Sequence, residues 1–79
     1  MTKEDIFLKI KETLVAEFQI NEASITPDAK LYQDLELDSI DAVDLLVTMK
    51  KYVTGKIVPE QFKKAVTVQD VVDLLHSLV

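Results

Sequence analysis

The sequence predicts an all-α fold: a small four-helix bundle with three main helices, a short third helix and a long first loop. Hydrophobic residues make up 48% of the 79 residues, which is enough for a packed core. One glycine and two prolines are too few for the many tight turns of a β-rich fold. Apolar residues recur at helical spacing in three separate segments. Because a chain of this length supports one core, we expect a single domain over residues 1–79.

The first helix is predicted over about residues 3–18. Thr2 precedes it and Asp5 follows three positions later, a pairing typical of a capped helix start. One side of this helix should face the core, since its apolar residues repeat every three or four positions. That stripe contains Ile6, Ile10 and Leu14, with Phe7 and Phe18 beside it.

Residues 19–37 are predicted to form a long connection, with a turn at Pro27-Asp28. A loop of this length in a compact domain needs either buried anchors or a function. Its isolated apolar residues are candidates for such anchors: Ile20, Ile25, Leu31 and Leu35.

The second helix is predicted over about residues 39–53. Asp38 has the side chain of an N-cap, and Asp41 is placed to complete a capping box. Ser39 then takes the first helical position, with its hydroxyl directed outward at a loop–helix junction. Gly55 is expected to stop this helix in the left-handed conformation that glycine accepts.

This second helix has two apolar faces. The first should pack into the core; it contains Ala42, Leu45, Leu46, Met49 and Val53. The second contains Ile40, Val43 and Val47, and Asp44 and Lys51 flank it. A second apolar face beside an exposed serine indicates a docking surface. A helix buried on two sides is the alternative.

A short extended linker, residues 56–58, should lead to the third helix. That helix is predicted over residues 59–64, because proline fits the first helical position, and Phe62 is its expected core anchor. The last helix is predicted over about residues 68–78. Its cap pair is Thr67 and Asp70, and its stripe is Val68, Val71, Val72, Leu75, Leu78 and Val79.

The stretch around Ser39 resembles a known motif. Asp38-Ser39-Ile40-Asp41 is similar to the Asp-Ser-Leu modification motif of acyl carrier proteins, and Leu31 and Asp34-Leu35 match that family's approach to it. The resemblance extends over almost the whole chain. Taken alone, an Asp-Ser-aliphatic triplet is more typical of simple helix capping. Its position in a short, acidic, helical chain is what favours the carrier interpretation.

The resemblance implies that a phosphopantetheinyl transferase, using coenzyme A and Mg²⁺, attaches phosphopantetheine to Ser39. The terminal thiol then holds acyl groups as thioesters, and the carrier is not an enzyme. The resemblance also implies the residues that would meet partner enzymes, such as acyl-transferring or ketosynthase-type enzymes. They are Asp38, Ile40, Asp41, Val43, Asp44 and Val47.

The chain departs from the family pattern at three places. Leu37 stands where a small residue is common, and Ile40 replaces the usual leucine. Lys50-Lys51 occupies a stretch that is typically acidic in carriers of primary fatty acid synthesis. Basic residues there would weaken docking to basic synthase enzymes. They therefore favour a carrier for a specialised acyl or polyketide-like pathway, with fatty acid synthesis still open.

The net charge of −5 argues against nucleic acid as a partner. Residues 1–49 contain four lysines and eleven acidic residues, a charge of −7, whereas residues 50–79 carry +2. This split fits either an acidic docking surface around Ser39 or two ordinary solvated faces. No apolar run is long enough for a membrane span, and the N-terminus is not a signal peptide. We expect a cytoplasmic monomer.

Other chemistry is poorly supported. A serine hydrolase needs a base, and His76, the single histidine, lies on the polar side of the last helix. Asp34, Glu36 and Asp38 alternate like calcium ligands, but Ser39 and Leu45 occupy the glycine and glutamate positions of that loop. We therefore expect no catalytic residue and no metal site. The remaining alternative is an unmodified helical interaction module that binds a protein partner through its second helix.

Overall fold

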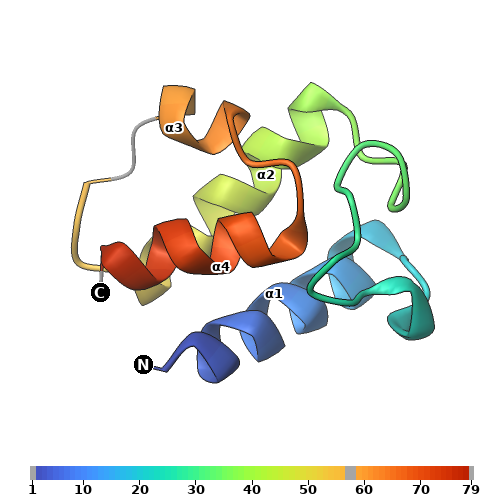
Figure 1. Cartoon of the computed structure of the whole chain (residues 1–79), viewed down its shortest axis with the longest axis horizontal. Helices are drawn as coiled ribbons and strands as arrows, with labels where there is room; N and C mark the ends of the chain where they lie inside the picture. Colours follow the sequence, from blue (N-terminus) through green and yellow to red (C-terminus); the bar gives the residue numbers. More distant parts are fainter. Residues whose placement is uncertain (1, 57–58, 79) are drawn as a thin grey trace.

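The computed structural model describes residues 2–56 and 59–78. Four α-helices and two short 3₁₀ helices follow one another in this part of the chain, which confirms the predicted all-α class. They are α1 (Lys3–Phe18), η1 (Glu22–Ser24), α2 (Ser39–Met49), η2 (Lys50–Tyr52), α3 (Pro59–Lys63) and α4 (Val68–Ser77). α1 packs against α2 and α4, while α3 lies over α2 and α4 (Figure 1).

The long helices begin at the predicted caps. The Asp5 N–H donates to the Thr2 hydroxyl and the Thr2 N–H donates to the Asp5 carboxylate, both at 3.1 Å. Thr67 and Asp70 form the same reciprocal pair at the start of α4. α1 has its predicted bounds, and α4 ends one residue earlier than predicted. The predictions for Ile57, Val58 and Val79 lie outside the described residues.

The core contains the predicted stripes. Ile6, Ile10 and Leu14 of α1 are fully buried, and Phe62 anchors α3 with 3% exposure. Four of the five predicted core residues of α2 are buried: Ala42, Leu45, Leu46 and Met49. Burial of these apolar side chains is the main stabilising contribution in so small a domain.

The long first loop is anchored, as predicted, by buried Ile25, Leu31 and Leu35, and Ile20 is partly buried. It is also paired to the start of α4, which the sequence did not predict. The Leu31 N–H donates to the Val66 carbonyl at 2.9 Å, and the Val68 N–H donates to the Ala29 carbonyl at 3.0 Å. These bonds hold the loop against the start of α4. The loop leads directly to Ser39, so its path positions the start of α2.

The predicted end of α2 was wrong. The helix ends at Met49 and tightens into η2, and Val53 is extended (φ −123°, ψ 149°) and partly buried. Gly55 does not have a positive φ, so it is not the left-handed stop that we expected. Its role is close packing: its N–H donates to the Leu78 carbonyl at 2.7 Å, and a Cβ there would lie 3.0 Å from Leu78.

Candidate functional site

Ser39 is the first residue of α2, and Asp38 and Asp41 cap the helix around it. The Asp41 N–H donates to Asp38 Oδ1 at 2.8 Å, and the Asp38 N–H donates to Asp41 Oδ2 at 3.3 Å. Ser39 is exposed, and its hydroxyl makes no hydrogen bond with the described residues. The capping function therefore belongs to the two aspartates, and the serine hydroxyl is left free at the surface.

Two buried leucines fix the approach to Ser39. Leu35 and Leu37 are each 5% exposed, and Glu36 between them is exposed with a φ of +56°. The Leu37 N–H donates to the Leu31 carbonyl at 3.1 Å. The left-handed conformation of Glu36 allows the side chains of both leucines to pack into the core. The next residue, Asp38, is then exposed at the surface. The large residue at position 37, a departure from the family pattern, is therefore a core residue.

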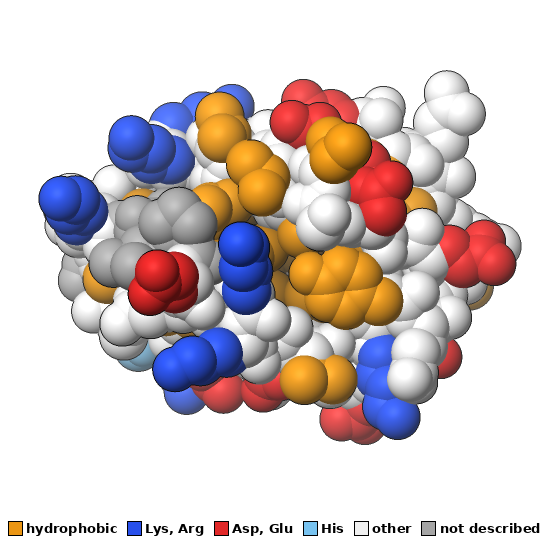
Figure 2. Space-filling view, turned by 90° about the horizontal axis from the view of Figure 1, so that it is seen from above, with side chains coloured by type: hydrophobic (Ala, Val, Ile, Leu, Met, Phe, Trp, Pro, Cys, Tyr) orange, Lys and Arg blue, Asp and Glu red, His pale blue; other side chains and the backbone are white. Residues whose placement is uncertain are grey.

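The second apolar face of α2 is exposed. Ile40, Val43 and Val47 are 71%, 45% and 63% exposed, so the alternative of a helix buried on two sides is wrong. We call these three residues the α2 stripe. Hydrophobic side chains and carboxylates lie together over the start of α2 when the molecule is seen from above (Figure 2). Asp44 is also exposed, beside the stripe.

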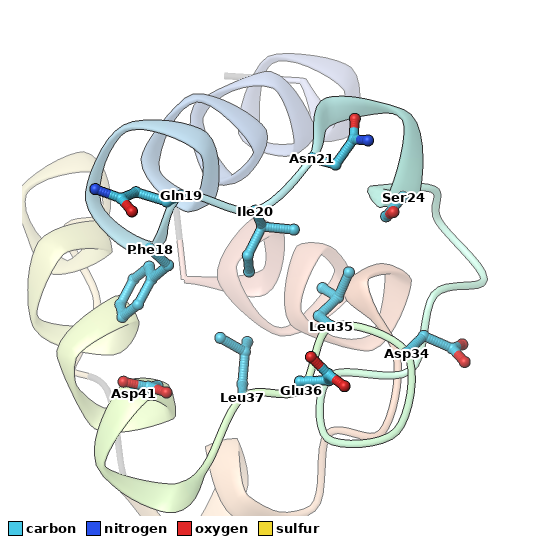
Figure 3. A pocket seen from close by; sticks show the side chains of 10 residues that line it. All are labelled: Phe18, Gln19, Ile20, Asn21, Ser24, Asp34, Leu35, Glu36, Leu37 and Asp41. Carbon is cyan, nitrogen blue, oxygen red and sulfur yellow. The ribbon is translucent and has the colours of Figure 1, made fainter.

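A pocket of about 450 Å³ opens between the end of α1, η1 and the chain that leads to Ser39. In its floor, Ile20, Leu35 and Leu37 point toward one another, while Asp34 points outward (Figure 3). Its full lining is Phe18, Gln19, Ile20, Asn21, Ser24, Asp34, Leu35, Glu36, Leu37 and Asp41. Carboxylates at its rim disfavour a phosphate group, and Ser39 does not line it.

The carboxyl groups with a shifted pKa lie at other places. The backbone N–H groups of Thr67 and Val66 hold the pKa of Asp70 below its usual value, and hydrogen bonds from Thr2 lower the pKa of Asp5. The Gln69 side chain and then Lys3 lower the pKa of Asp73. These shifts reflect helix caps and surface contacts of α1 and α4, because each carboxylate accepts hydrogen bonds.

The single histidine and the acidic side chains are the groups relevant to hydrolytic and metal chemistry. His76 is exposed in the last turn of α4. Across residues 2–56 and 59–78, no group of three or more histidine or acidic side chains is placed to hold a metal ion. Within the same ranges, no helix has the length and apolar composition needed to cross a membrane.

The sequence analysis missed two features of this region. The left-handed turn at Glu36 has a weak signal, since a polar residue stands between two apolar ones in a segment that precedes a helix cap. The pocket has no sequence signal, because its walls come from segments far apart in the chain.

Comparison with known proteins gives the class. The family described as "Phosphopantetheine attachment site" matches residues 9–75 of the chain. "Acyl carrier protein 2" of Ralstonia nicotianae is 41% identical over 78 residues, covering 99% of this chain and 96% of that protein. "Acyl carrier protein" of Petrotoga mobilis is 36% identical over 77 residues, covering 98% and 91%. The corresponding protein of Coprothermobacter proteolyticus is also 36% identical over 77 residues, covering 98% and 94%.

The helical fold and these matches define a small phosphopantetheine-binding carrier. The chain belongs to the acyl carrier protein family. Its members present cargo to biosynthetic enzymes and are not themselves enzymes, so the predicted family, the carrier function and the phosphopantetheine cofactor are confirmed.

Proposed function

We propose that Ser39 is the residue to which phosphopantetheine is attached, and that the chain presents acyl groups from there. The observation that supports this most is the free, exposed hydroxyl at the first position of α2. Asp38 and Asp41 satisfy the helix start, so modification of Ser39 breaks no capping bond. When bound, the group supplies a thiol that holds acyl groups as thioesters.

The carboxylates of Asp38 and Asp41 oppose a phosphate ester on the Ser39 oxygen, but the helix start offers it compensating interactions. The first turn of a helix has N–H groups without intrahelical partners and the positive end of the helix dipole, and both favour an attached phosphate. The exposed position leaves room for an arm that extends away from the domain. We expect a transferase to supply the group from coenzyme A.

The docking residues in this proposal are the three carboxylates and the α2 stripe. Apolar contact through Val43 and its neighbours would give affinity, and the carboxylates would steer basic partners toward Ser39. The partners are the transferase and acyl-transferring or ketosynthase-type enzymes. The docking set is Asp38, Ile40, Asp41, Val43, Asp44 and Val47.

We further propose that the chain serves a specialised acyl or polyketide-like pathway rather than primary fatty acid synthesis. The support is chemical: Lys50 and Lys51 are exposed in η2, directly after α2, where they would repel basic synthase enzymes. The working unit in this proposal is one monomeric domain over residues 1–79, because the α2 face must stay open to successive enzymes. Its place would be the cytoplasm, where coenzyme A is available.

Intact mass spectrometry tests the attachment site. Incubation with coenzyme A, Mg²⁺ and a broad-specificity transferase should add one phosphopantetheine mass to the wild type and none to Ser39→Ala. Ser24→Ala and Ser77→Ala are matched controls, because both serines are exposed, and both variants should be modified normally. If several transferases leave the wild type unmodified, the interaction-module alternative is favoured. A mass gain in Ser39→Ala would place the site elsewhere.

A further inference from the structure

Lysines are concentrated in one segment of this acidic chain. Residues 50–66 contain five lysines and one glutamate, a net charge of +4, whereas the rest of the chain carries −9. All five lysine side chains are exposed. We call them the lysine surface: Lys50, Lys51, Lys56, Lys63 and Lys64.

The fold places these lysines on neighbouring elements of the bundle. Lys50 and Lys51 lie in η2, directly after α2, and Lys63 and Lys64 lie at the end of α3, which packs against α2. Between them, the Gly55 N–H donates to the Leu78 carbonyl just after α4. Several lysine side chains lie in the left part of the view from above, with hydrophobic side chains and one acidic side chain among them (Figure 2).

Acidic side chains do not compensate the lysine surface within the described part of the chain. The ion pairs found there use Lys3, Lys9 and Lys11. Lys51 Nζ instead lies 5.2 Å from the centre of the Tyr52 ring, and Lys9 Nζ lies 5.7 Å from the same ring. Gathered like charges repel one another and oppose folding, so folding does not explain the arrangement.

The lysine surface begins where α2 ends. Lys51 follows Val47 by four positions and lies in η2, directly after the last turn of α2. At the other end of the stripe, Asp38 and Asp41 flank Ser39. With a rise of about 1.5 Å per residue, Ser39 and Lys50 lie about 16 Å apart along the helix axis. Over that distance the charge of the face changes from negative to positive.

We propose that the lysine surface binds a protein partner that has a carboxylate patch beside an apolar one. This inference rests on the proposed function and extends it: the partner would be basic around Ser39 and acidic about 16 Å away, at the far end of α2. Such a two-signed face fixes the orientation of docking, because a reversed partner would bring like charges together.

The charge distribution favours a protein over an extended polyanion. Asp38, Asp41 and Asp44 lie within about 18 Å of Lys50 along α2, and the residues outside 50–66 carry a net charge of −9. A membrane surface or a nucleic acid is negative throughout, so it would face this acidic end as well as the lysines. A protein surface can change sign over the same distance.

Two designed helical peptides test the proposal by amide NMR titration at low salt. Both have a leucine face, flanked by glutamates in one and by lysines in the other. The glutamate peptide should shift the amide signals of residues 47–56 and 60–66, and the lysine peptide those of residues 38–44. Lys50→Gln with Lys51→Gln should weaken binding of the glutamate peptide about three- to tenfold.

The matched control is Lys3→Gln with Lys11→Gln, the same charge change at lysines that already pair with Asp73 and Glu22. It should leave binding unchanged, and Val47→Gln should weaken it. Equal weakening by the control pair, or no effect of Val47→Gln, overturns the proposal. Binding of the wild type to phosphatidylglycerol vesicles, lost in the Lys50/Lys51 variant, overturns it in favour of a membrane.

The titration is made on the full chain with and without phosphopantetheine. Because peptide binding does not require the modified serine, a negative titration leaves the mass measurement on Ser39 unaffected. Conversely, if no phosphopantetheine mass is added to Ser39, the titration still tests whether the lysine surface binds the glutamate peptide.

Discussion

Adjacent residues of α2 offer a matched test of which face is for partners. Val43 is 45% exposed, whereas Ala42 is 3% exposed. Full burial of a valine side chain stabilises by about 1.5–3 kcal/mol, so a half-exposed valine contributes about 1 kcal/mol. Val43→Asp should therefore lower the free energy of unfolding by about 1 kcal/mol or less. Ala42→Asp puts a charge into the core and should cost several kcal/mol.

Urea and thermal unfolding measure the first part of this prediction. For a domain of this size, 1 kcal/mol corresponds to a shift in Tm of about 4–8 °C. The second part is functional: Val43→Asp should stay folded yet react more slowly with the transferase, because it breaks the apolar stripe and adds charge. If Val43→Asp unfolds as readily as Ala42→Asp, the face is core. If it folds and reacts at the wild-type rate, the stripe is not a docking surface.

Three further predictions follow from particular contacts. Lys50→Glu with Lys51→Glu should raise the rate of reaction with housekeeping fatty acid synthase enzymes at low salt. Added salt should reduce the difference in rate between this variant and the wild type. Equal rates at low salt would remove the support for a specialised pathway. Gly55→Ala should cost about 1–3 kcal/mol in urea unfolding, because its Cβ would meet Leu78 at 3.0 Å; an unchanged midpoint would contradict this packing role. The Asp70 carboxyl has a folded-state pKa below 3.8, so its stabilising contribution is present above that pH and is lost as pH falls through the lower folded value. The free energy of unfolding of Asp70→Asn, measured in urea, should therefore depend less steeply on pH below the ordinary aspartate pKa than that of the wild type. Parallel pH profiles of the two proteins would show that Asp70 does not couple folding to protonation.

The helix starts were predictable because their causes are local. Thr2 with Asp5, Asp38 with Asp41, and Thr67 with Asp70 each lie three positions apart, and all three pairs form capping boxes. The capping box depends on a few adjacent residues, so the pattern in the sequence is nearly the whole interaction. The exposure of Ser39 followed from the same pattern.

The features that were missed depend on contacts between distant segments. Gly55 looks like a helix stop in the sequence, but it is required by Leu78, which approaches it from the end of α4. The hydrogen bond between Leu31 and Val66 likewise joins residues that no local pattern relates. Glu36 adopts a left-handed conformation because both neighbouring leucines are buried, an outcome of the tertiary packing.

The division of roles at the start of α2 explains how modification and folding can be independent. If the serine were itself the N-cap, its hydroxyl would accept a backbone N–H, and esterification would disturb a bond that typically contributes about 1 kcal/mol. Here Asp38 accepts the Asp41 N–H at 2.8 Å, so the hydroxyl of Ser39 contributes no cap. The helix is consequently complete before modification, and a transferase would meet the same folded surface that later partners meet. This is why we expect Ser39→Ala to keep the wild-type stability while it loses the attachment site.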